Sequence, residues 1–471
     1  MSKNNEENND DYSVRRAIGF SFGGFADVIT YQFFTFLIFT FYYAVIGLDV
    51  NLITIGFILW SVWNALNDPF LGYISDKTTT RYGKRKIYIM IASIPLCIIL
   101  VLLWTPPSST LAAYLYFIII IILFDTIYTM YSINVTSVFP VMFQDLDSRA
   151  KANIIRQAFA VIGLIFAFIF PSFFIPDYER SEYAPNYVIT SIILAIIVGI
   201  SILIFLKYGI KEREEFVQES KSSPKFFDSL KLTFKNKAFI SFVIASLCNW
   251  YVFGILPTIV PLYGKFVLGI PEGQSILLSL LLGLAFISAA IFNFLWKYVS
   301  LKIGLRKGYM LSMISFILTL IPFFFLSETV GGYSAAIFAF FFLGIGLAGS
   351  LYFRDPIVST IADQDELNTG VRREGSFYGV NALIMRLSTI FIFLTISTVF
   401  TSVGWKVFTA DITEAHRTGL KLLMSLFPII ALGIGVVAIN FFPITKEKYQ
   451  EIKQNVNKLH KEKQQKLQRK N

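Results

Sequence analysis

Polar side chains interrupt one apolar segment of this chain at the spacing of a helical turn. Trp60, Asn64 and Asp68 follow one another at intervals of four residues, so they share one face of a helix. An acid inside a membrane-spanning helix is costly and marks a functional site by default. A buried carboxylate beside neutral oxygens can bind a hard cation such as Na⁺, and it can also carry a proton. Asn64 and Asp68 therefore predict a cation site, with H⁺ ahead of Na⁺ because only one of the two is an acid.

Two further apolar segments carry polar stripes of their own. Asp27 and Tyr31 are four residues apart on the first segment. The fourth segment has polar residues at the spacing i, i+4, i+7 and i+11, on one helix face: Asp125, Thr129, Ser132 and Thr136. Acids on stripes of several helices favour a shared, water-accessible cavity over contact with lipid. The alternative is that these side chains form interhelical hydrogen bonds, worth only about 0.6 kcal/mol each.

A cavity of this kind would suit a polar solute. Carboxylates and hydroxyls exchange hydrogen bonds with a polyol, arginines pair with a carboxylate or phosphate, and aromatic rings offer flat faces. The side chains predicted to bind the substrate are Asp27, Tyr31, Trp60, Asp125, Ser132, Thr136, Arg156 and Arg386. A glycoside, a uronide and a zwitterion are all open on this chemistry.

The composition places these stripes in a membrane protein. Of 471 residues, 55% are apolar and only 15% are charged, where a soluble protein carries about 25% charge. The net charge of +10 lies in short loops and in the C-terminal tail, so it indicates topology rather than nucleic-acid binding. No Ser/His/Asp arrangement, nucleotide loop or metal cluster occurs in the sequence, and the two histidines and two cysteines argue against an enzyme, a cofactor or a metal site.

Twelve apolar stretches reach the length of about 20 residues that a membrane-spanning helix needs. They are 17–47, 52–75, 86–105, 111–143, 153–175, 187–208, 238–263, 274–299, 305–327, 333–359, 374–402 and 418–443. With an even number of spans both termini lie on one side, and that side holds 34 of the 41 Lys and Arg residues. The positive-inside rule therefore predicts cytoplasmic termini and a multi-pass protein of the cell membrane.

The long polar segment after the sixth span divides the chain into two halves. We expect two pseudo-symmetric six-helix bundles, supported by related loops at 81–86 and 302–307. The predicted domains are an N-terminal tail (1–16), a first bundle (17–208), an inter-bundle loop (209–237), a second bundle (238–443) and a basic tail (444–471). That tail either adheres to anionic lipid or is simply solvated.

Three motifs resemble one known family. Residues 67–76 read N-D-P-x-x-G-x-x-x-D and are followed by R-x-G-K-R-K at 81–86. The segment 356–375, which runs from the end of span ten to the start of span eleven, contains D-x-D-E-x-x-T-G-x-R-x-E-G, and 128–140 reads Y-T-x-x-x-I-x-V-x-x-V-x-P. This pattern is similar to that of the glycoside–pentoside–hexuronide:cation symporters of the major facilitator superfamily, which implies an all-α transporter with twelve membrane helices.

The resemblance assigns roles to individual positions. Asp68 matches the family's cation-binding acid and Thr129 a threonine near that cation. Asp27 matches a sugar-binding acid, Arg156 approximates an arginine near the sugar, and Arg386 falls where the family usually has a lysine. Asn64 and Ser132 depart from the pattern, because the best-known member has a cation-binding and a sugar-binding acid there. The resemblance therefore implies the transporter fold and mechanism more strongly than it implies the identity of the substrate.

The family's cytoplasmic motif implies a gate. Its predicted members are Asp76, Arg81, Lys84 and Arg85 in the first half and Arg372, Arg373 and Glu374 in the second. Alternating access around one site would follow, with a small molecule, a coupling cation and membrane lipid as the partners of a monomer. An amphiphile such as a lysophospholipid is an alternative substrate, and a non-transporting membrane sensor is an alternative function.

Overall fold

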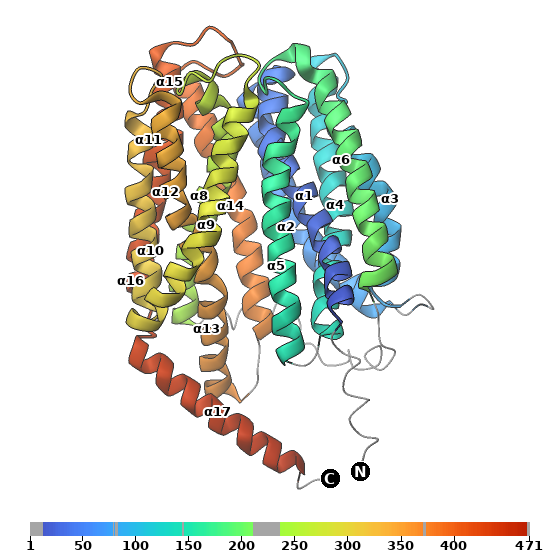
Figure 1. The fold of residues 1–471 in the computed structure, drawn as a ribbon, viewed down its shortest axis with the longest axis vertical. Coiled ribbons are helices and arrows are strands. Elements are labelled where there is room, and N and C mark those ends of the chain that lie inside the picture. Colours follow the sequence, from blue (N-terminus) through green and yellow to red (C-terminus); the bar gives the residue numbers. More distant parts are fainter. Residues whose placement is uncertain are drawn as a thin grey trace. The chain divides into compact units, whose positions relative to one another are not determined.

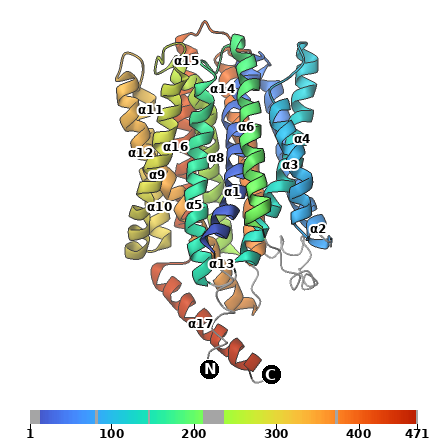
Figure 2. The same cartoon turned by 45° about the vertical axis from the view of Figure 1, so that its right-hand side comes forward.

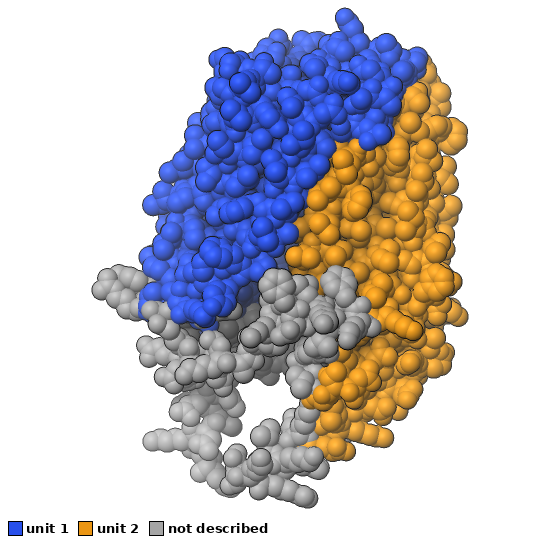
Figure 3. Space-filling view, turned by 180° about the vertical axis from the view of Figure 1, so that it is seen from behind, with its two compact units in different colours: residues 1–223, 257–283, 396–417 blue, residues 224–256, 284–395, 418–471 orange. Residues whose placement is uncertain are grey.

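The computed structural model describes residues 13–78, 80, 83–143, 146–210, 236–370 and 374–468. Helices dominate the described part of the chain, and they group into two compact units that Figure 3 colours separately. Eleven of these helices are long and apolar enough to cross a membrane, and Lys86–Leu102 is a shorter apolar helix at the place of the third predicted span. The all-α membrane class is therefore confirmed, whereas twelve spans and cytoplasmic termini stay predictions.

Unit 1 comprises residues 1–223, 257–283 and 396–417. Its complete helices are α1 (Val14–Thr40), α2 (Val50–Lys77), α3 (Lys86–Leu102), α4 (Thr110–Met142), α5 (Leu146–Ile169) and α6 (Ala184–Ile204). Helix α1 packs against α5 and α6, while α3 lies beside α4 and α6 (Figure 2). The unit also holds the last turns of α8 (Lys237–Phe266) and the start of α9 (Ser275–Ile303).

Unit 2 comprises residues 224–256, 284–395 and 418–471. It contains α10 (Leu305–Leu320), α11 (Pro322–Phe325), α12 (Gly332–Tyr352), α13 (Arg354–Thr369), α16 (Phe427–Asn440) and α17 (Lys446–Gln468). Most of α14 (Glu374–Ser402) also belongs to it, and α15 (Glu414–Lys421) spans the division between the units. Helix α10 packs against α12 and α16 (Figure 1).

The connection between the tenth and eleventh predicted spans is largely helical. The sequence predicts that span ten ends at residue 359 and that a connection follows, but α13 continues as helix to Thr369. Pro356 lies in the first turn, where its missing N–H costs no helical hydrogen bond. The helix ends at Gly370, whose φ of 75° is a left-handed conformation that glycine adopts without strain.

The basic C-terminal segment forms a helix that contacts α13. Helix α17 buries Ile452 and Val456, which are four residues apart on one face. His460 lies one turn further along, and its Nε2 is 3.2 Å from a carboxylate oxygen of the buried Glu366. Figure 1 shows α17 running alongside the end of α13. The tail at 444–471 thus has a specific packing partner within unit 2.

Helices α2 and α4 approach each other closely in unit 1. Gly56 on α2 has no side chain, and a Cβ at this position would lie 2.5 Å from the ring of Phe117 on α4. The small residue therefore allows the two helices to pack tightly, as small residues do between membrane helices. This packing fixes how the polar side chains further along both helices face one another.

Candidate functional site

Five polar side chains of α2 and α4 meet inside unit 1, and we call them the α2–α4 polar cluster: Asn64, Asn67, Asp68, Asp125 and Thr129. Asn64 donates from Nδ2 to Oδ1 of Asp125 at 2.6 Å, and Asn67 donates from Nδ2 to Oδ2 at 3.1 Å. Asn64 and Asp125 are each only 1% exposed. Both oxygens of Asp125 therefore act as acceptors, as in an ionised carboxylate.

The second acid of the cluster contacts a hydroxyl. Thr129 donates from Oγ1 to Oδ1 of Asp68 at 3.1 Å, and Asp68 is half-buried. The Asn64–Asp125 and Asp68–Thr129 pairs both join positions 61 residues apart, so α2 and α4 run in the same direction with one register. The two pairs are one helical turn apart on each helix, about 6 Å along the axis.

The backbone of α2 supplies one more oxygen to this region. Pro69 lies inside the helix directly after Asp68. Proline has no N–H, so the carbonyl of Ala65 lacks its usual donor four residues later. The motif N-D-P thus places within one turn an acid and a backbone carbonyl to which Pro69 cannot donate, and both are ligands that hard cations prefer.

Aromatic rings line α1, α2 and α4 next to this cluster. Tyr31 stacks on Tyr128 with ring centroids 5.1 Å apart. Phe34 contacts both Phe124 and Trp60, at 4.4 and 5.7 Å between centroids. The indole Nε1 of the buried Trp60 has no hydrogen-bond acceptor among the described residues. This N–H is a donor that a ligand could use.

The remaining predicted substrate residues of unit 1 are less buried than the α2–α4 polar cluster. Asp27 and Ser132 are half-buried, and Thr136 is exposed. Arg156 on α5 is half-buried, donates from Nε to Oδ1 of Asn153 at 3.2 Å, and lies 4.6 Å from the ring centroid of Phe139. Tyr31 and Trp60 contact the aromatic rings of α1 and α4, whereas Arg156 contacts the ring of Phe139, so a common site for all of these residues stays a prediction.

The other predicted site residues lie elsewhere. Arg386 is half-buried on α14 in unit 2. Asp76 lies near the end of α2, Glu374 begins α14, and Lys84 and Arg85 are half-buried just before α3. The predicted gate residues Arg81, Arg372 and Arg373 fall outside the described residues. The gate therefore stays a prediction.

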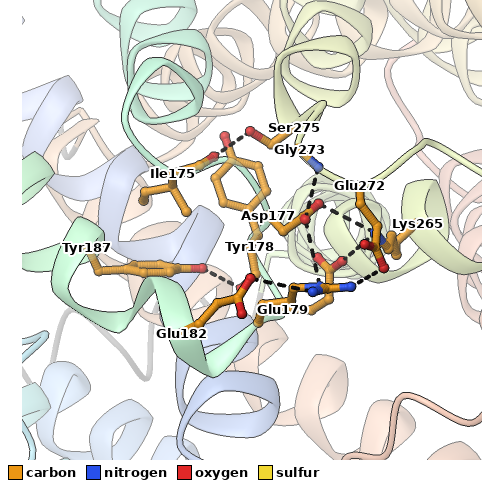
Figure 4. A network of polar contacts seen from close by, with 11 residues as sticks. Ile175, Asp177, Tyr178, Glu179, Glu182, Tyr187, Lys265, Glu272, Gly273 and Ser275 are labelled. Atoms are coloured by element: carbon orange, nitrogen blue, oxygen red, sulfur yellow. Dashed lines mark hydrogen bonds and ion pairs between the residues drawn. The ribbon is translucent and has the colours of Figure 1, made fainter.

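Sequence reasoning missed a cluster of charges in unit 1, in which two buried acids lie beside more exposed charged side chains. We call it the loop charge cluster: Asp177, Glu179, Arg180, Lys265 and Glu272, all of which except Arg180 are labelled in Figure 4. Lys265 Nζ lies 3.5 Å from Asp177 Oδ1 and 3.4 Å from Glu179 Oε1. Arg180 pairs with Glu272 and lies 3.8 Å from Asp177, which also accepts the backbone N–H of Gly273 at 3.0 Å. The cluster joins the connection before α6 to the end of α8.

Burial shifts the acid–base behaviour of this cluster. The side chains of Asp177 and Glu179 are each 6% exposed, and both acids face the single ammonium of Lys265. Desolvation raises the pKa of Glu179 to about 7, and the nearby charge of Asp177 adds to the effect while Lys265 opposes it. Nothing in the sequence indicated that Asp177 and Lys265, which are 88 positions apart, meet.

The sequence as a whole matches one family of known proteins. The model of the MFS/sugar transport protein family aligns with residues 19–446. The chain belongs to this family. Its relatives and structural neighbours are membrane transporters rather than enzymes, and the chain is a multi-span membrane transporter.

Individual relatives are distant but align over most of their length. The isoprimeverose transporter of Lactiplantibacillus pentosus is 21% identical, over 91% of this chain and 88% of that protein. Sodium-dependent lysophosphatidylcholine symporter 1 of Gallus gallus is 22% identical, over 85% of this chain and 81% of that protein. The crystal structure of the nucleoside transporter NupG superposes with a TM-score of 0.67 at 15% identity, over 91% of this chain and 99% of that chain. This structural likeness shows the transporter fold alone.

Proposed function

We propose that this family member is a secondary active transporter that couples entry of a cation, H⁺ or Na⁺, to symport of a sugar, a glycoside or a sugar acid. Membership of the MFS/sugar transport protein family supports the sugar class, as does the relative named as an isoprimeverose transporter. The mechanism we propose is alternating access, in which the substrate and cation sites open to one side of the membrane at a time.

The α2–α4 polar cluster is the observation that carries this proposal. Two aspartates, two asparagines and a threonine meet inside membrane-spanning helices. Such side chains cost free energy inside a membrane, so their presence indicates a functional site. Their oxygens are the ligands that hard cations prefer. Asp68 is the acid in this cluster that remains half-buried, and we propose that the cation reaches the cluster through it.

We propose the aromatic and polar side chains near this cluster as the substrate side of the same unit. Tyr31 and Trp60 offer ring faces, and the indole N–H of Trp60 can donate to a sugar hydroxyl. Asp27, Ser132 and Arg156 add acceptors and a charged donor. Arg156 would favour a solute with a carboxylate, through two parallel hydrogen bonds.

A lysophospholipid is the second candidate substrate. The relative from Gallus gallus is a sodium-dependent lysophosphatidylcholine symporter, and its alignment covers 85% of this chain. An amphiphile would use the same cation coupling but would need apolar contacts for its acyl chain. The aromatic rings of α1 and α4, including Phe34 and Phe124, could supply them.

Uptake into liposomes that contain the purified protein tests the proposal. The panel comprises pentosides, hexosides, hexuronates and a lysophospholipid, each measured with an inward Na⁺ gradient, an inward H⁺ gradient or neither. We expect a cation gradient to accelerate uptake of a sugar-type solute, and Asp68→Asn to remove that acceleration. Uptake of no solute under any gradient would contradict the proposed function, and uptake of the lysophospholipid alone would select the second candidate.

A further inference from the structure

We propose that Asp125 is the second carboxylate of the cation site, that it supplies from α4 the negative charge that Asn64 lacks on α2, and that the coupling cation is Na⁺. This inference rests on the proposed cation-coupled symport. It moves Asp125 from the substrate side, where the sequence pattern placed it, to the cation side. It also reverses the preference for H⁺ that followed from counting a single acid on α2.

The geometry of α2 and α4 is the first argument. Asn64 pairs with Asp125, and one turn later Asp68 pairs with Thr129 in the same register. Each pair thus contains one carboxylate and one neutral partner, and the carboxylate lies on α4 in the first pair and on α2 in the second. One ion with two bonds of about 2.4 Å to oxygen connects oxygens about 5 Å apart. Asp125 and Asp68 are one turn apart, so each can contribute one oxygen to the same ion.

The surroundings of Asp125 are the second argument. Its side chain is 1% exposed, and its two oxygens accept from the amides of Asn64 and Asn67. Amide donors hold a carboxylate in its acceptor form, whereas a proton carrier must present its own O–H to an acceptor. An acid engaged in this way is poorly placed to hydrogen-bond a sugar, but it can contribute its charge to a cation beside it.

A buried oxygen without a donor is the third argument. Asn64 donates a hydrogen bond from Nδ2 to Asp125. The Oδ1 of Asn64 is buried without a hydrogen-bond partner among the described residues. The two ends of one amide are covalently fixed, so this oxygen lies in the same cluster as the Asp125 carboxylate. A buried carbonyl oxygen with no donor is unfavourable, and a bound cation would satisfy it. The carbonyl of Ala65, to which Pro69 cannot donate, is a further oxygen on α2.

These observations together describe a site made of oxygens. Two carboxylates, an amide oxygen, a threonine hydroxyl and a backbone carbonyl suit a hard cation, and oxygen ligands of this kind discriminate against soft metals. Na⁺ needs several such oxygens at once, which explains why the acceptors gather over two turns. A proton would need only one of them.

The decisive experiment exchanges the two side chains of the first pair. Na⁺-induced thermal stabilisation of the purified full-length protein is measured as NaCl replaces choline chloride at constant ionic strength. We expect saturable stabilisation of the wild type, at least a tenfold weaker apparent Na⁺ affinity in Asp125→Asn, and recovery to within a few fold in the double variant Asn64→Asp/Asp125→Asn. Recovery is expected because the exchange returns the carboxylate to the pair from the opposite helix. Thr126→Val is the matched control, because Thr126 is the next residue on α4 and accepts from Trp63 instead.

Several results would overturn the inference. The first is that Asp125→Asn binds Na⁺ as tightly as the wild type. The second is that the double variant binds Na⁺ as weakly as Asp125→Asn. The third is that Na⁺ does not stabilise the wild type at any pH. The last measurement needs no variant, so it holds even if a substituted protein fails to fold. Uptake that an H⁺ gradient drives and Na⁺ does not affect would overturn the role of Na⁺ while leaving symport intact. Absence of all uptake would instead contradict the proposed function, independently of the Na⁺ titration.

Discussion

The loop charge cluster makes a prediction about pH that the structure allows us to quantify. Glu179 has a pKa raised from 4.5 to about 7, chiefly because burial penalises its charged form. Asp177 adds repulsion and Lys265 opposes the shift, while Tyr178 and Tyr187 lie beside the group (Figure 4). We call the cluster closed when Glu179 is buried in it and open when Glu179 is exposed to water. Because the pKa of Glu179 is higher in the closed state, its full contribution to the stability of that state is present below pH 4.5. This contribution is lost as the pH rises from 4.5 to 7, and the loss is constant above pH 7.

The size of this effect follows from the shift. If opening the cluster returns Glu179 to water, raising the pH from 5 to 8 makes opening easier by about 2.5 kcal/mol, or roughly 70-fold. Glu179→Gln keeps the shape and removes the titrating group. We therefore expect the variant to show the same opening free energy at pH 5 and pH 8, and to be more stable than the wild type by about 3 kcal/mol at the higher pH.

Hydrogen–deuterium exchange of residues 174–183 and 264–274, corrected for the intrinsic pH dependence of exchange, measures this opening. Glu182→Gln is the control, because the side chain of Glu182 is 58% exposed and contacts Arg180 from the surface. Its opening free energy should vary with pH as in the wild type. The reasoning is refuted if Glu179→Gln keeps the wild-type pH dependence, or if the wild type opens equally at pH 5 and pH 8.

Three further predictions concern the rest of the site. Asp68→Asn should abolish acceleration of uptake by a cation gradient. Thr129→Val removes a hydroxyl and its hydrogen bond of about 1.5 kcal/mol to a carboxylate, but no charge, and should weaken cation affinity only about tenfold; equal losses in the two variants would contradict the assigned roles. Asp76→Ala should shift the balance of inward and outward states in a fluorescence or crosslinking assay without removing substrate binding, and loss of binding would count against a gate. Gly56→Leu should lower stability by about 1 to 3 kcal/mol in thermal unfolding, because its side chain meets Phe117, and unchanged stability would show that α2 and α4 can move apart there.

Much of the architecture could be predicted from the sequence because local rules govern it. The length of each apolar stretch predicted where the helices lie, and the spacing of Asn64 and Asp68 placed both on one helix face. The same spacing placed Asp125 and Thr129 together on the fourth helix. The helical part of the connection at 360–369 was missed, because its charged composition is equally typical of a loop.

The sequence by itself determined that this is a helical membrane transporter with acids inside its spans, since hydropathy and helical period depend only on neighbours along the chain. Only the tertiary structure decided which of those acids belong together. Asp125 meets Asn64 because the packing of α2 against α4 sets their register, and Glu179 meets Lys265 because the connection before α6 reaches the end of α8. Contacts between residues far apart in sequence depend on how helices pack, and one chain read alone contains no direct record of that packing.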